Sequence, residues 1–201
     1  MVRKFTAEDI IHFPEVQILQ HKRSNGTYKD YLIIKRKDFI SCFVTIDHHI
    51  GIFVEQYRPI IKQKTFEVPM GKIEVSDPSR DHTVHRELAE EINLILQPHP
   101  HIIVKNRKNG TISHLYFLEW KLKYLGFEYP SPGFSDYKNY RYILQLMTSN
   151  RNFHQLTEKY ELFSQEPQLK VVSRPLNEAL FDEICGITRH YLTDFLYRCK
   201  K

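Results

Sequence analysis

Arg86-Glu87-Leu88-Ala89-Glu90-Glu91 is the stretch that decides the fold class, because the hydrophobic period of the chain changes around it. Beyond Asp77 the period changes from that of a strand to that of a helix, and Val84, Leu88 and Ile92 recur every four residues behind an Asp-Pro start signal. This pattern predicts a helix from about Pro78 to Ile92, which Asn93 ends in the left-handed conformation.

Three glutamates of this helix, Glu87, Glu90 and Glu91, lie at i, i+3 and i+4, within about 100° of arc on one face. Like charges this close repel one another, and a cation offsets the repulsion. Mg²⁺ and Mn²⁺ suit clustered oxygen ligands and also hold phosphate oxygens, so the predicted chemistry is metal-assisted hydrolysis of a phosphoanhydride. A solvated acidic face, balanced by Arg86 and nearby lysines, is an equally open interpretation.

Segments of strand character surround the helix, and they predict an α+β fold with a mixed sheet covered by helices. The Asn109-Gly110 pair is a strong hairpin signal between His101–Val104 and a strand over Ser113–Tyr124. Prolines and a glycine predict a loop over Leu125–Asn139. The other predicted strands are Tyr31–Ile34, Ile40–Ile46, Ile50–Val54, Tyr140–Met147 and Val171–Val172, and the other predicted helices are Leu176–Ile184 and Thr188–Cys199.

Composition excludes several classes of protein. The chain has 201 residues, 41% of them hydrophobic, which is enough for a full core. Its seven glycines form neither a dinucleotide-binding fingerprint nor a Walker A loop, and no Gly-x-Ser-x-Gly elbow occurs. Three scattered cysteines give no disulfide framework. The net charge of +5 is spread among short basic groups, so nucleic-acid binding is not expected. Without an apolar signal region or a membrane-length apolar run, we expect a cytoplasmic protein with no membrane contact.

Two segments together resemble a known sequence motif. Phe66-Glu67-Val68-Pro69-Met70-Gly71, followed by Arg86-Glu87-Leu88-Ala89-Glu90-Glu91-Ile92-Asn93-Leu94, is similar to the Nudix box. The Arg-Glu-Leu-x-Glu-Glu core is intact. Asp77 stands where the box has its first Glu, one extra residue precedes Arg86, and Asn93 replaces the final Gly. Asp77 is also a candidate N-cap of the helix at Pro78.

The resemblance extends to the ADP-ribose and ADP-sugar pyrophosphatases of that superfamily. Four further segments, in the expected order, are similar to theirs: Val54–Pro59, Glu67–Gly71, Ser131–Asp136, and Leu169–Arg174 with Leu176–Leu180. The match runs from about residue 22 to residue 197. It implies a mixed sheet between helices, with an antiparallel β region at the N-terminus.

The resemblance also implies roles for individual residues. Magnesium ligands would be Glu87, Glu91 and Glu90, with the backbone carbonyl of Met70. Arg86, Gly71 and Asp77 would orient them. Substrate contacts would come from Arg58, Glu67 and Phe134, although Arg58 could instead form an ion pair with Glu55 or Glu67. The loop glutamate that usually serves as the base in this subfamily is replaced by Tyr137, a poor base at neutral pH. Asp136 is the first candidate for that role, and Glu119 and Glu128 are weaker ones.

These expectations define one function and its rivals. We expect an N-terminal β-rich region over 1–48, which permits strand exchange in a homodimer, and a catalytic domain over 49–201 with an inserted hairpin at 98–124. The expected reaction is Mg²⁺-dependent hydrolysis of an ADP-sugar to AMP and a sugar phosphate. The alternatives are a nucleotide sensor that does not cut its ligand, or a hydrolase of another nucleotide sugar, a dinucleotide or a capped RNA.

Overall fold

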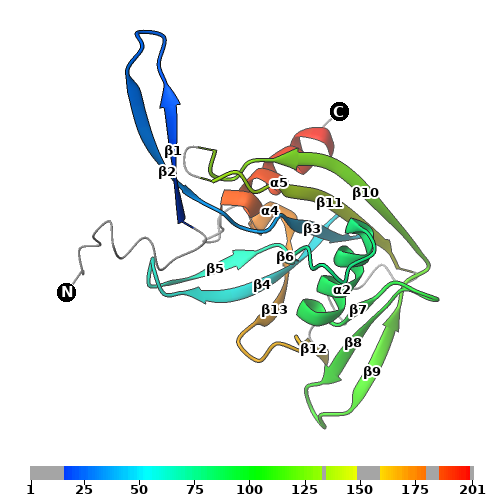
Figure 1. Ribbon diagram of the computed structural model, residues 1–201. Coiled ribbons are helices and arrows are strands. Elements are labelled where there is room, and N and C mark those ends of the chain that lie inside the picture. The colour runs from blue at the N-terminus through cyan, green and yellow to red at the C-terminus, as the bar shows by residue number, and fades with distance from the viewer. Residues whose placement is uncertain (1–15, 133–134, 149–158, 180–185, 200–201) are drawn as a thin grey trace.

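The computed structural model describes residues 16–132, 135–148, 159–179 and 186–199, and within these ranges it is a mixed α+β fold built mostly of strands (Figure 1). The helices are α2 (Arg80–Ile92), α4 (Leu176–Ala179) and α5 (Gly186–Cys199). The strands are β1 (Val16–Lys22), β2 (Tyr28–Ile34), β3 (Phe39–Ile46), β4 (Ile50–Arg58), β5 (Gln63–Glu67), β6 (Met70–Lys72), β7 (Leu94–Ile95), β8 (His101–Asn106), β9 (Ile112–Tyr116), β10 (Glu119–Glu128), β11 (Asn139–Met147), β12 (Tyr160–Leu162) and β13 (Lys170–Pro175).

A seven-stranded mixed sheet forms the centre of the described chain, in the order β10-β11-β3-β4-β13. Strands β11 and β3 run parallel, and the other neighbours are antiparallel. Strand β5 pairs with β4 and β6 pairs with β3, so the chain from β5 to β6 lies where β3 and β4 diverge. A smaller sheet of β12, β8, β7 and β9 lies beside it.

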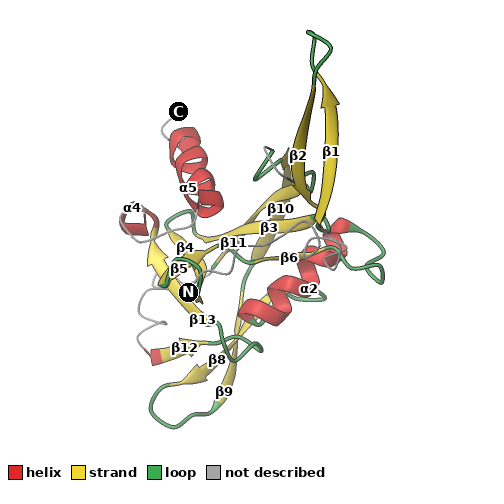
Figure 2. Cartoon of the chain, turned by 60° about the vertical axis from the view of Figure 1, so that its left-hand side comes forward, coloured by secondary structure: helices red, strands yellow, loops and turns green. Residues whose placement is uncertain are grey.

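Helices cover both faces of the central sheet (Figure 2). Successive side chains of β3 point to opposite faces, so Ile40 and Val44 pack in the same core as Leu88 of α2. Phe43 points the other way and packs with Tyr191 and other residues of α5. Burial on both faces explains why β3 is a nearly continuous hydrophobic run in the sequence.

The predicted helix is confirmed, with a different start. Asn93 has a φ of 53° and ends α2 in the left-handed region, as expected. Its N-cap is Ser79, whose side chain accepts the His82 backbone N–H at 3.1 Å. The alternative of Asp77 as N-cap is therefore wrong, because Ser79 takes that position and α2 begins at Arg80.

The hairpin at Asn109-Gly110 is confirmed, since β8 and β9 pair antiparallel across it. The single strand predicted over Ser113–Tyr124 is wrong. Strand β9 belongs to the smaller sheet and β10 to the central one, and the chain crosses between them at Phe117, whose N–H donates to Pro100, and Leu118, whose N–H donates to Met147.

The loop predicted over Leu125–Asn139 begins too early, because β10 continues to Glu128. Gly126, with a φ of 106°, lies at an irregularity in the pairing of β10 with β11, and this lets the strand continue. The C-terminal helix begins two residues before the predicted Thr188. For the helix predicted over Leu176–Ile184, residues 176–179 are helical and the rest lie outside the described residues.

The β1–β2 hairpin extends away from the rest of the chain, and both views show it (Figures 1 and 2). Strand β3, by contrast, pairs with β4 and lies in the central sheet. The division of the chain at residue 48 stays a prediction. Within the described ranges, the helices are too short or too polar to span a bilayer.

Candidate functional site

Two carboxylates of α2 are buried against the start of β6. Glu87 is 6% exposed and Glu91 is 8% exposed. Glu91 accepts the backbone N–H of Met70 at 2.9 Å. The Glu87 carboxyl group occupies the space next to Gly71, where the Cβ of any other residue would overlap it. A residue without a side chain is therefore required at position 71 for this close approach.

Arg86 joins this helix to the loop that precedes it. Its guanidinium donates to the carboxylates of Glu87 at 2.7 Å and Glu90 at 3.0 Å, and to the Lys72 carbonyl at 2.9 Å. It also donates twice to Asp77, at 3.1 and 3.2 Å. The predicted orienting residues Arg86 and Asp77 thus lie in one network with Glu87.

Asp77 fixes the loop before α2 through further bonds. It accepts the Glu74 backbone N–H at 3.0 Å and the Thr83 hydroxyl at 2.9 Å. Hydrogen bonding to the Arg86 guanidinium holds the pKa of Asp77 well below its usual range. The carboxylate is therefore ionised at neutral pH, and its oxygens are engaged in holding the loop.

Burial raises the pKa of Glu87 above its usual value, although the neighbouring Arg86 opposes the shift. Burial raises the pKa of Glu91 to about 9, with smaller contributions from the negative charges of Glu87, Glu166 and Glu67. Two adjacent carboxyl groups are thus held where ionisation is costly. A cation bound beside them would remove that cost.

The residues at this site could hold a magnesium ion with two protein carboxylates. Among the residues that the structure describes, no three His, Cys, Asp or Glu side chains form a ready metal cluster. Magnesium, however, is commonly held by one or two carboxylates together with waters and substrate phosphates. Glu87 and Glu91 supply that pair. Glu90 binds Arg86, as Glu87 does, but unlike Glu87 its side chain is largely exposed, at 41%.

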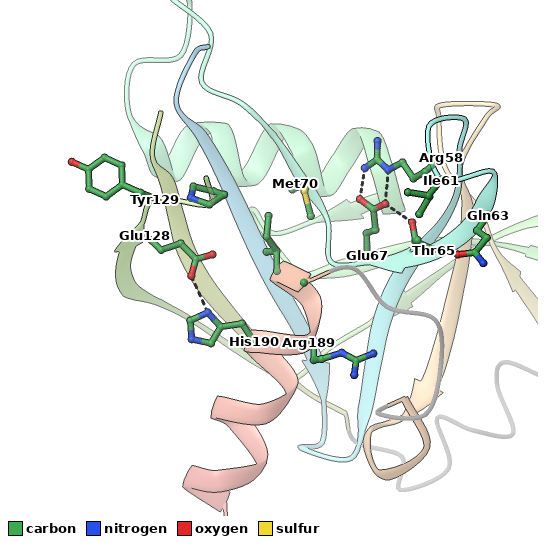
Figure 3. Close-up of a pocket in the computed structure, with 13 residues that line it drawn as sticks. Arg58, Ile61, Gln63, Thr65, Glu67, Met70, Glu128, Tyr129, Arg189 and His190 are labelled. Atoms are coloured by element: carbon green, nitrogen blue, oxygen red, sulfur yellow. Dashed lines mark hydrogen bonds and ion pairs between the residues drawn. The ribbon is translucent and has the colours of Figure 1, made fainter. Parts of the chain in front are cut away.

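Met70 lines a cavity of about 840 Å³ (Figure 3). Because its backbone N–H also donates to Glu91, the cavity adjoins this site. Its walls come from β4 to β6, the end of β10 and the start of α5. The lining residues are Arg58, Ile61, Gln63, Thr65, Glu67, Met70, Glu128, Tyr129, Pro130, Gly186, Ile187, Arg189 and His190. Glu87, Glu90 and Glu91 do not line it.

One wall of the cavity carries an ion pair between Arg58 and Glu67. Arg58 donates through Nε to Glu67 at 2.6 Å and also through Nη2, and Thr65 donates to the same carboxylate at 2.6 Å (Figure 3). The sequence left open whether Arg58 contacts substrate or forms an ion pair with Glu55 or Glu67. The ion pair is present and its partner is Glu67, while Glu55 binds Lys64. Both predicted substrate residues nevertheless border the cavity.

The opposite wall carries a Glu128–His190 pair (Figure 3). His190 Nδ1 lies 2.9 Å from one carboxylate oxygen of Glu128, and Asn139 donates to the other at 3.0 Å. Arg189, on the turn of α5 beside it, adds a second guanidinium to the lining. The α5 residues were missed from the sequence, because no motif marks that helix.

Asp136 and Tyr137, further along the loop after β10, lie elsewhere. Asp136, the candidate base, forms an ion pair with Lys35 and borders a different cavity, beside Leu19 and Tyr31. Tyr137 packs its ring 5.6 Å from that of Phe39. Neither lines the cavity next to Met70. Phe134 lies outside the described residues.

Comparison of the chain with protein-family models gives no match, and comparison with the sequences of curated proteins gives none either.

Proposed function

We propose that the chain is a Nudix-type hydrolase that uses Mg²⁺ or Mn²⁺ to cleave the diphosphate linkage of an ADP-sugar, such as ADP-ribose. The products would be AMP and a sugar phosphate. The observation that carries the proposal is the burial of Glu87 and Glu91 side by side against Met70 and Gly71, next to a large cavity.

The cavity supports a diphosphate ligand in size and charge. A volume of about 840 Å³ falls within the usual range for small-molecule sites. The guanidinium groups of Arg58 and Arg189 border it, and guanidinium groups suit phosphate oxygens. Tyr129 and Ile187 offer apolar surface in the same lining for a base or a ribose.

Hydrolysis adds the oxygen of water to phosphorus, breaks the bridging P–O bond and releases one proton from the water. A divalent cation, when bound, supplies charge neutralisation and polarises the phosphoryl group. Glu87 and Glu91 would hold it, while Arg86 keeps Glu87 in place and Met70 fixes Glu91. Glu67 and Glu128 are the carboxylates of the cavity lining, and we propose them as acceptors of the proton.

The test is to incubate the purified chain with ADP-ribose and Mg²⁺ and to follow AMP. We expect AMP to form with Mg²⁺, to stop with a chelator, and to fall at least a hundredfold in Glu91→Gln. Glu161→Gln, an exposed change on β12, is the matched control and should keep full activity. The enzyme proposal is wrong if the chain hydrolyses none of the following: ADP-sugars, other nucleotide sugars, dinucleotides, nucleoside triphosphates and capped RNA.

A second candidate is a nucleotide sensor that does not cut its ligand. It is favoured by the position of Asp136 and Tyr137, neither of which lines the cavity where a base would act. A rise in melting temperature with ADP-ribose, without formation of AMP, would support the sensor over the enzyme.

We also propose that the β1–β2 hairpin joins two copies of the chain. A two-stranded hairpin alone is marginally stable in water, and this one exposes 58% of Ile18, 52% of Leu19 and 49% of Leu32. Light scattering should give twice the chain mass, and deletion of residues 16–34 should give the monomer mass. A monomer mass for the whole chain would refute the dimer.

A further inference from the structure

A second cavity, of about 610 Å³, lies between the first half of α2 and strands β10 and β11. It shares no lining residue with the cavity next to Met70. Its lining is rich in rings and in polar groups: Asp81, His85, Gln97, Trp120, Lys121, Leu122, Tyr124 and Tyr142. The proposed hydrolase has no use for this site.

The aromatic rings of this second cavity are held by one another and by the core. Tyr124 lies 5.3 Å from Tyr142, centroid to centroid, and the Arg80 guanidinium lies 5.3 Å above the Tyr124 ring. Trp120 is partly buried against the main core, with the His85 ring edge-on at 6.1 Å. Rings fixed in this way offer a rigid stacking surface, which costs little entropy when a planar ligand binds.

The polar groups of the same cavity select what can stack there. Asp81 and Tyr142 both line the cavity, and Asp81 lies on the exposed side of α2. A carboxylate accepts about four hydrogen bonds, so Asp81 provides acceptor capacity at the cavity wall. The Arg80 guanidinium, above the Tyr124 ring, places a positive charge at the rim.

We propose that this cavity binds the purine base of a guanine nucleotide. The Watson–Crick edge of guanine carries two adjacent N–H donors, which match the two oxygens of the Asp81 carboxylate. Adenine presents one donor beside an acceptor nitrogen, and a carboxylate repels that nitrogen. The ring would stack on Tyr124 and Trp120, and Arg80 would face the phosphate. This proposal is independent of the hydrolase, because it uses no residue of that site.

Trp120 makes the proposal directly measurable, because it is the single tryptophan of the chain. The fluorescence of the full-length protein, excited at the red edge where nucleotides do not absorb, reports on this cavity. We expect GMP to change the emission and to saturate, AMP to bind at least tenfold more weakly, and ribose 5-phosphate to have no effect.

Two variants test the roles of charge and ring. Asp81→Asn should weaken GMP about tenfold or more and leave AMP within about twofold, since a charged hydrogen-bond acceptor is lost. Tyr124→Ala should weaken both nucleotides, while Tyr28→Ala, an exposed tyrosine on β2, should change neither. Glu91→Gln should keep GMP binding, so loss of hydrolysis and loss of this site are distinguishable.

The proposal is overturned if GMP leaves the emission unchanged at millimolar concentration. It is also overturned if AMP and GMP bind equally, or if Asp81→Asn binds GMP as tightly as the wild type.

Discussion

The substitution Glu91→Gln should make the metal-free protein more stable, although it removes a group from the proposed metal site. Glu91 is buried, and burial raises its pKa from an ordinary 4.5 to about 9. Glutamine is uncharged at every pH, and its side-chain oxygen can still accept the Met70 N–H. The substitution therefore removes the cost of burying an ionisable group and preserves the contact.

The size of the effect follows from the difference in proton affinity between the folded and unfolded states. Below pH 4.5 both states hold the proton and the cost is absent. Above it the unfolded state loses its proton first, and each pH unit favours unfolding by about 1.4 kcal/mol until the pH reaches about 9. At pH 7 the cost is about 3 kcal/mol, and at pH 5 it is below about 1 kcal/mol.

Thermal denaturation in the presence of a chelator measures this difference. For a chain of this length about 3 kcal/mol corresponds to a rise of roughly 6 to 12 °C in Tm at pH 7, and the rise should nearly vanish at pH 5. Glu161→Gln, an exposed glutamate, should leave Tm unchanged. Saturating Mg²⁺ should stabilise the wild type by about 2.7 kcal/mol at a hundredfold excess over Kd, and the variant by much less. A Glu91→Gln protein that melts below the wild type in chelator, and gains as much from Mg²⁺, would refute this reasoning.

Three more predictions concern contacts around the site. Gly71→Ala should lower stability by about 1–3 kcal/mol and weaken Mg²⁺ stabilisation, because the new Cβ overlaps Glu87; urea denaturation with an unchanged midpoint would contradict this. Asp77→Asn should weaken the dependence of the free energy of unfolding on pH at acidic pH. Because the pKa of Asp77 is lowered in the folded state, its ionised carboxylate stabilises the fold above about pH 4, and this stabilisation is lost as the pH falls through the folded-state pKa. A variant whose stability depends on acidic pH as the wild type's does would count against the network with Arg86. Tyr191→Phe should cost about 1–3 kcal/mol in urea, because its hydroxyl accepts the buried Tyr142 N–H at 3.0 Å and donates to the Ser41 carbonyl at 2.8 Å; full retention of stability would show that these bonds are replaced.

Local signals in the sequence were enough to predict α2, which carries the proposed metal ligands, and the β8–β9 hairpin. The four-residue period of Val84, Leu88 and Ile92 specifies α2, and Asn93 ends it because asparagine tolerates a positive φ. The hairpin at Asn109-Gly110 follows from turn chemistry in the same way. Each of these signals lies within a short stretch of sequence, so predicting these two elements needs no knowledge of tertiary contacts.

Contacts between distant segments could not be predicted from local patterns. The exchange of sheets at Phe117 depends on bonds to Pro100, and nothing near Phe117 in the sequence indicates it. The cavity wall formed by Glu128 and His190 joins residues 62 positions apart. Likewise, whether Arg58 would pair with Glu55 or Glu67 depended on the register of β4 with β5, which tertiary packing sets.

The central claim is that Glu87 and Glu91 together hold a divalent cation, and Mn²⁺ binding followed by electron paramagnetic resonance tests it most directly. The free Mn²⁺ signal should fall on addition of the wild type and of Glu161→Gln, with about one ion bound per chain. It should stay unchanged with a Glu87→Gln/Glu91→Gln double variant that is folded by circular dichroism. Equal binding by the double variant, or no binding by the wild type in the presence or absence of ADP-ribose, would contradict the claim.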